Sequence, residues 1–219
     1  MRNTARNTTR STLATLALIT AVLPALQGCV TAVATGVGAG ALMIVDRRSA
    51  GTYVEDEGIE WKTASRIGEK FGSSTHVNAT SYNRRVLLTG EAPDAQTKNE
   101  VEKIASGVPN VHALTNEIQI GGASTYAARS NDAYLTSKVK ARFVETDKFS
   151  AAHVKVVTEA GTVFLMGLVT RKEADDATDI ARTTGGVQKV VRVFEYIGED
   201  QARQLDNRPP ENMPPAKKP

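Results

Sequence analysis

Apolar positions along the chain change twice from a spacing of four residues to a spacing of two. Two segments repeat a mostly apolar pattern at every fourth position: Ile59, Thr63, Ile67 and Phe71 in the first, where Thr63 is the polar exception, and Leu135, Val139 and Phe143 in the second. Alternating apolar residues follow each of them, over residues 77–82 and 85–89 and over residues 153–158 and 163–169. A spacing of four is typical of an amphipathic helix and alternation of a half-buried strand. Each half of the chain is therefore predicted to begin with a helix and to continue into a hairpin.

A second helix and a last strand complete each half. The helices are predicted over residues 94–106 and 172–184, because Gly107 and the Gly185-Gly186 pair that follow them are typical of helix ends. The last strands are predicted over residues 111–120 and 189–197. The order α-β-β-α-β predicts an α+β fold in which a small three-stranded sheet packs against two helices.

The two halves are also related in sequence. The pattern Val-x-Leu-x-Gly at Val86, Leu88 and Gly90 recurs 77 residues later as Val163, Leu165 and Gly167. We therefore predict two domains, over residues 58–120 and 131–197, with a linker over residues 121–130. The two glycines are expected where a strand needs close backbone approach or a bulge.

The residues before the first domain have the order of a secretory signal peptide. Arg2, Arg6 and Arg10 precede an almost uncharged apolar run over residues 11–26. The tetrad Leu26-Gln27-Gly28-Cys29 resembles the bacterial lipoprotein box, which implies cleavage before Cys29, attachment of a diacylglycerol to its thiol, and palmitate among the acyl chains. Residues 1–28 are then the signal peptide and residues 29–57 a lipidated N-terminus and tether. The alternative is that Cys29 is a buried or free thiol behind a signal that is cut elsewhere.

Processing changes the charge of the protein. The full chain has 27 basic and 24 acidic residues, but removal of three arginines leaves 24 of each. The mature protein is thus formally neutral, and nucleic acid is not expected as a partner. The last segment, residues 198–219, contains five prolines and few apolar residues, and it is expected to be disordered.

Catalytic and metal-binding motifs were not found. His76, His112 and His153 are scattered without the spacing of a zinc helix, and Cys29 is the one cysteine. The acids of residues 173–179 are expected on a solvated helix face. The sequence therefore predicts a protein that is not an enzyme and that has no metal and no cofactor.

The order of elements, the Val-x-Leu-x-Gly strands and the residues 154–181, "VKVVTEAGTVFLMGLVTRKEADDATDIA", resemble the BON domain. Two such domains behind a lipoprotein box are similar to the dual-BON outer-membrane lipoproteins, a family of division- and stress-associated lipid-binding proteins. The resemblance implies a lipid-anchored protein on the periplasmic face of the outer membrane, enriched at division sites. It also implies an anionic phospholipid, such as phosphatidylglycerol, as the ligand.

In that family the lipid contact lies on the first helix of the second domain, which matches residues 131–148. The resemblance places an aromatic contact on Tyr134, where the family has tryptophan, and an apolar contact on Val144. Read from the residues alone, Asn131 or Ser130 can cap this helix, and its apolar stripe is bordered by Tyr134 and by cations. The predicted lipid-binding residues are Tyr134, Lys138, Lys140, Arg142 and Val144.

Two alternatives stay open at this stage. The helix face can be solvated without a ligand, and the opening helix of the first domain, with Trp61, is a competing lipid surface. A different function class is a protein adaptor that docks on outer-membrane assembly or cell-wall remodelling proteins. The adaptor hypothesis predicts an exposed apolar patch away from Tyr134, on a sheet face or around Trp61.

Overall fold

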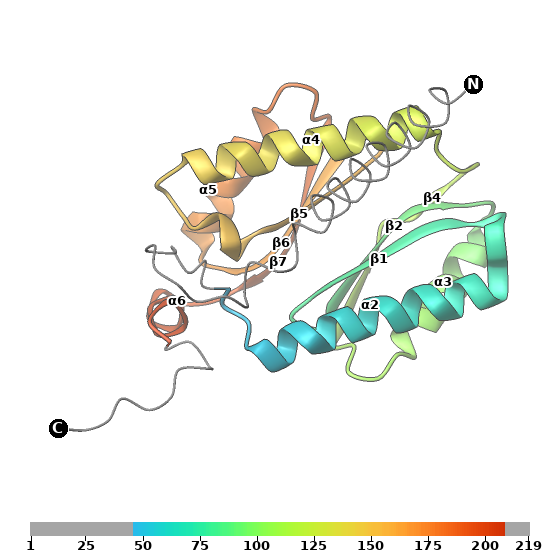
Figure 1. Ribbon diagram of the computed structural model, residues 1–219, viewed down its shortest axis with the longest axis horizontal. Helices are drawn as coiled ribbons and strands as arrows, with labels where there is room; N and C mark the ends of the chain where they lie inside the picture. The colour runs from blue at the N-terminus through green and yellow to red at the C-terminus, as the bar shows by residue number, and fades with distance from the viewer. Residues whose placement is uncertain (1–45, 209–219) are drawn as a thin grey trace, which may run out of the picture. The chain divides into compact units, whose positions relative to one another are not determined.

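The structure is a computed structural model that describes residues 46–208 (Figure 1). Its helices and strands follow in chain order: α2 (Ala50–Phe71), β1 (His76–Tyr82), β2 (Arg85–Ala92), α3 (Ala95–Ser106), β3 (Ala113–Asn116), β4 (Gln119–Ile120), α4 (Tyr126–Glu145), β5 (Lys155–Glu159), β6 (Thr162–Val169), α5 (Arg171–Arg182), β7 (Lys189–Tyr196) and α6 (Glu199–Asp206). Two short 3₁₀ turns, Gly72–Ser74 and Ala151–His153, precede β1 and β5. The predicted α+β fold with two repeats is confirmed.

The two domains have the same sheet topology. In the first, β1 pairs antiparallel with β2, and β2 pairs in parallel with β3 and β4. In the second, β5 pairs antiparallel with β6, and β6 pairs in parallel with β7. Both predicted hairpins are thus confirmed, and the helix between the second and third strands of each domain provides the crossover that a parallel pair requires.

The last strand of the first domain is not continuous, contrary to the prediction for residues 111–120. It divides into β3 and β4 on either side of Glu117 and Ile118. The physical reason is the side chain of Ile118, which leaves the ladder and is buried in the core between the sheet and its helices. The backbone N–H of Glu117 still donates to the carbonyl of Leu88, at 2.9 Å.

Each domain has its own core on the helix-covered face of its sheet. In the first, α2 and α3 cover the alternate residues Val86, Leu88 and Ala92 of β2 (Figure 1). In the second, α4 and α5 cover Val163, Leu165 and Val169 of β6. The intervening residues of each strand point to the opposite face, as the period of two requires.

A third core joins the two domains through those opposite faces. Tyr82 and Leu87 of the first sheet pack with Phe164, Met166 and Leu168 of the second. Both central strands are therefore buried on both faces. The sequence did not predict this contact between the sheets.

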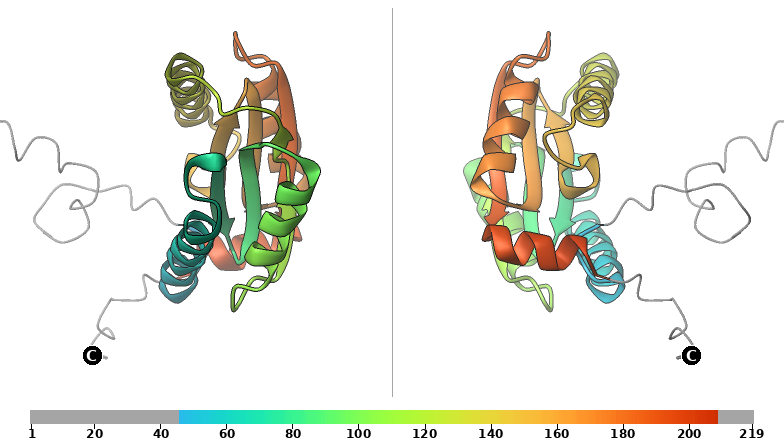
Figure 2. Two further views of the ribbon diagram at one scale, coloured as in Figure 1. Left: turned by 90° about the vertical axis from the view of Figure 1, so that its right-hand side faces the viewer. Right: turned by 90° about the vertical axis from the view of Figure 1, so that its left-hand side faces the viewer.

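Two predicted boundaries at the periphery are wrong. Residues 199–206 form helix α6, although disorder was expected from residue 198; Ala202 and Leu205 pack into the core between the sheets, and Figure 2 shows α6 lying across one end of the strands. Helix α2 likewise begins at Ala50, inside the predicted tether, because the Ser49 side chain caps it by accepting from Thr52 N at 3.1 Å.

Arg47, just before α2, connects this segment to helix α6. Its guanidinium is buried and donates to the carboxylates of Glu173 and Asp206 and to the carbonyl of Leu168, at 2.7–2.9 Å. Glu173 was expected on a solvated face of its helix. It instead forms a capping box with Thr170 at the start of α5 and receives Arg47.

Candidate functional site

Helix α4 carries the predicted lipid-binding residues. It begins at Tyr126 and its N-cap is Thr125, whose hydroxyl accepts from Ala128 N at 3.2 Å. The predicted caps, Asn131 and Ser130, are wrong because the helix starts a turn and a half earlier. Residues 126–130 contain neither glycine nor proline, so nothing ends the helix before Thr125. Half of the expected linker is therefore helical.

The inward face of α4 fixes the orientation of the helix. Leu135, Val139 and Phe143 are buried, as the spacing predicted. Asp132 is buried beside them, and its two carboxylate oxygens accept from the N–H groups of Ala160 and Gly161, each at 2.9 Å. The burial of Asp132 removes one acid from the exposed surface of α4.

The outward face of α4 presents two tyrosines and a valine to solvent. Tyr126 is 84%, Tyr134 62% and Val144 74% exposed. Three small exposed residues lie between them: Ala133, Ser137 and Ala141. At about 100° per residue, these six residues share one side of the helix, and the exposed Glu145 lies at its edge, next to the direction of Tyr134. We call them the outward face. Its apolar groups are available for contact with a surface.

Cations border the outward face. Arg129 lies over the ring of Tyr126 at 4.5 Å and Lys138 over the ring of Tyr134 at 5.4 Å. Such cation–π contacts hold the charged groups next to the aromatic rings. Lys140 is exposed and makes no hydrogen bond or ion pair with another residue in the described part of the chain.

Two of the predicted cations also have structural partners. Arg142 donates to the carbonyl of Ile180 at 2.7 Å and to the hydroxyls of Thr183 and Thr184 at 3.1 and 2.8 Å. Lys138 donates to the carbonyl of Gly185 at 2.7 Å. Both charges therefore lie at the C-terminal end of α5, where a helix favours positive groups. The sequence did not predict this role.

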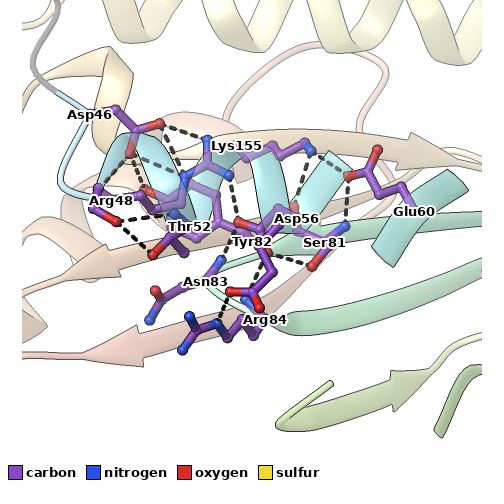
Figure 3. A network of polar contacts seen from close by, with 12 residues as sticks. Asp46, Arg48, Thr52, Asp56, Glu60, Ser81, Tyr82, Asn83, Arg84 and Lys155 are labelled. Atoms are coloured by element: carbon purple, nitrogen blue, oxygen red, sulfur yellow. Dashed lines mark hydrogen bonds and ion pairs between the residues drawn. The ribbon is translucent and has the colours of Figure 1, made fainter. Parts of the chain in front are cut away.

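A groove lies beside the C-terminal end of α4, between the two domains. Lys140 and Val144 line it together with Arg48, Tyr82 and Lys155. Figure 3 shows that Arg48 and Lys155 are held in a network of acids: Arg48 donates to Asp46 and Asp56, and Lys155 donates to Glu60 at 2.8 Å. Asp46 and apolar side chains also line the groove, so Lys140 is the one cation of its lining without a partner among residues 46–208.

The comparisons with known proteins decide the family. Residues 56–122 and 131–198 each match the model of the BON domain. The chain belongs to the BON-domain family. The chain is 38% identical over 174 residues to the outer membrane lipoprotein DolP of Haemophilus influenzae. The aligned region covers 78% of this chain and 90% of DolP. It is 35% identical to the 21 kDa hemolysin of Actinobacillus pleuropneumoniae (70% and 80% covered) and 27% identical to the osmotically-inducible protein Y of Escherichia coli (71% and 80%).

The first BON domain has an exposed apolar surface of its own. Trp61 is 71% and Val54 70% exposed, and the two lie seven residues apart on one side of α2. Trp61 is therefore not buried between the domains. This α2 patch, Val54 and Trp61, competes with the outward face of α4 as a contact surface.

The membrane anchor predicted at Cys29 lies outside the described residues, as do the signal peptide and most of the tether. Within residues 46–208, no helix has the length and apolar content that a membrane span requires.

The structure also brings together three titratable residues that lie far apart in the sequence. His76 of β1 and Glu91 of β2 meet Glu159 of β5, and one ligand atom from each lies within 4.8 Å of the other two. Burial raises the pKa of Glu159, and so does the nearby charge of Glu91. The available signal was the strand period, which places His76 and Glu91 on the sheet face away from the helices.

Proposed function

We propose that this protein is an outer-membrane lipoprotein, anchored through Cys29, whose second BON domain binds anionic phospholipid through α4. It has a binding role rather than a catalytic one, and it supports envelope integrity at division sites. The observation that carries the proposal is the exposure of Tyr134 and Val144 on one side of α4, with cations beside them. The relationship to a protein named as an outer membrane lipoprotein supports the location.

The geometry suits a helix that lies in the membrane interface. Tyrosine places an apolar ring in the acyl boundary and its hydroxyl among the headgroups, and Val144 contributes an apolar contact three turns along the helix. Lys140 is free to bind a phosphate, and an anionic surface attracts each nearby cation by about 1 kcal/mol. The acyl anchor keeps the helix near the bilayer, so a weak site is sufficient.

Vesicle flotation tests this function. The protein is residues 29–219 with Cys29→Ser, which removes the acyl chains and retains both domains. We expect it to float with vesicles that contain phosphatidylglycerol and not with phosphatidylcholine alone. Tyr134→Glu with Val144→Glu should weaken binding at least about 10-fold, because two charges then repel an anionic surface at about 1 kcal/mol each.

The matched control places the same two charges on the first domain. Val54→Glu with Trp61→Glu should leave vesicle binding unchanged. Equal binding to neutral vesicles would contradict the preference for anionic lipid. Loss of binding in the α2 variant alone would place the lipid contact on the first BON domain.

A second candidate function is that of a protein adaptor, which the exposed α2 patch favours. Its partner is an outer-membrane assembly or cell-wall remodelling protein, and Trp61 is the anchor of the contact. This function predicts that the α2 variant keeps vesicle binding but fails to restore detergent resistance to cells that lack the protein.

A further inference from the structure

A cluster of titratable side chains lies between the two BON domains, apart from α4. His76 and Glu91 are partners in the β1–β2 register, and Asn78 and Thr89 are the next pair on the same face. That face points toward the second domain, from which Glu159 extends at the end of β5. Asn78 Nδ2 donates to Glu159 Oε2 at 3.2 Å, so the cluster includes both domains.

The charges in this cluster are not balanced by the surrounding protein. Glu91 and Glu159 are buried, and no lysine or arginine among residues 46–208 pairs with either of them. The imidazole of His76 is the one basic group in contact, with Nδ1 at 2.9 Å from Glu91 Oε2. Two buried carboxylates that share one imidazole are costly without a further positive charge.

An unpartnered hydroxyl points to the same place. Thr89 is 1% exposed, and its Oγ1 lies close enough to the Glu159 carboxylate to lower the pKa of that group, but it forms no hydrogen bond of good geometry. The hydroxyl of Ser124, whose N–H donates to Glu91 at 3.2 Å, is also buried without a partner. Buried hydroxyls are normally paired, and a water bound to a cation between the two carboxylates would give these hydroxyls a partner.

We propose that His76, Glu91 and Glu159 bind one divalent transition-metal cation of the zinc class, which joins the two BON domains. One imidazole and two carboxylates are a ligand set that zinc accepts. Zinc bonds of about 2.0–2.2 Å place tetrahedral ligands about 3.4 Å apart, so no separation within the cluster has to shorten by more than about 1.4 Å on binding. Thr89 then fixes the orientation of the Glu159 carboxylate or of a water on the metal.

The position of the cluster allows a metal to enter from solvent and lets a bound metal stabilise the contact between the domains. The side chain of His76 is 23% exposed and opens the cluster to solvent. Because Glu159 comes from the second domain and the other two ligands from the first, the metal stabilises the contact between the sheets. Binding weakens as the pH falls, because the ligands bind metal in their deprotonated forms.

Calorimetric titration with Zn²⁺ tests the proposal on residues 29–219 with Cys29→Ser, made without a histidine tag and stripped with chelator. We expect one Zn²⁺ per chain, a Tm that rises with Zn²⁺ concentration, and no such rise with Mg²⁺. His76→Gln, Glu91→Gln and Glu159→Gln should each abolish both effects. His112→Gln, which changes an exposed histidine of the same domain, should change neither.

The metal-free proteins separate this site from a purely structural contact. Glu159→Gln removes one of two like charges, so its Tm without Zn²⁺ should equal or exceed that of the parent. No stoichiometric Zn²⁺ binding, or binding that survives in all three variants, would overturn the proposal. Binding that is lost in His76→Gln and retained in Glu159→Gln would place the metal on the first domain and overturn the bridge.

Discussion

One aspartate in each domain holds the turn of that domain's hairpin. Asp132 binds the N–H groups of Ala160 and Gly161, and Asp56 binds those of Asn83 and Arg84 at 2.8 and 2.7 Å. Both turns have positive φ at two successive residues, between 47° and 71°. This geometry matches the twist of a hairpin but is strained for residues other than glycine. The hydrogen bonds to the helix aspartate offset that strain.

Asp56→Asn is expected to destabilise the protein by about 1.5–3 kcal/mol, because hydrogen bonds to a charged acceptor contribute that much. Asp56 also accepts from Ser81 Oγ and from Arg48. Urea unfolding at pH 7 measures the loss. Glu57→Gln, an exposed acid on the same helix, should change the free energy of unfolding by less than about 0.5 kcal/mol.

The loss of stability in Asp56→Asn should depend on pH. Burial opposes the charge of Asp56, but the hydrogen bonds from Ser81, Arg84 and Arg48 outweigh it and hold the pKa below its usual range. A carboxyl with a lowered pKa in the folded state stabilises the protein above its unfolded pKa of about 3.9, and this contribution is lost as the pH falls through the folded value. The difference between wild type and variant should thus shrink below about pH 3.9. A constant difference would contradict this account.

At the scale of elements, the sequence predicts those features that produce a regular spacing of apolar residues. The apolar stripes of the helices, both hairpins and the repeat follow from this spacing, because an element that buries one face must carry apolar residues at the period of that face. The errors are at ends and short elements. Thr125 and Ser49 cap helices earlier than the stripes begin, and α6 is too short and polar to signal itself, since it depends on tertiary contacts of Ala202 and Leu205.

A substitution that breaks the apolar contacts of helix α6 should detach the helix without unfolding the domains. Ala202→Asp places a charge in the core between the sheets and should cost about 1–3 kcal/mol, a loss limited by the apolar contacts that dock the helix. Hydrogen exchange should become fast over residues 199–206 and stay slow in the strands. Gln204→Asp, on the exposed side of α6, is the control and should keep α6 protected. Fast exchange throughout the second domain would contradict an independently docked helix.

At the scale of the whole molecule, the candidate site was only partly predictable. Tyr134 and Val144 are exposed, as their positions beside the apolar stripe predict, because helix geometry alone determines on which side of the helix they lie. The partners of Lys138 and Arg142 lie 38–47 residues away along the chain, which no local pattern encodes. The cluster of His76, Glu91 and Glu159 was not predictable either, because strand alternation gives the face of a sheet on which a residue lies but not what packs on that face.

The contact between the sheets can be separated from the two domain cores. Leu87 is fully buried between the sheets, whereas Leu88 is buried under the helices of its own domain. Leu87→Asp should therefore part the domains and leave each folded, because both retain a core of their own. Small-angle scattering should show a larger radius of gyration while the far-ultraviolet circular dichroism is unchanged. Val54→Asp, the same added charge on an exposed site, should change neither. Loss of the dichroism in Leu87→Asp would show that neither sheet is stable without the other.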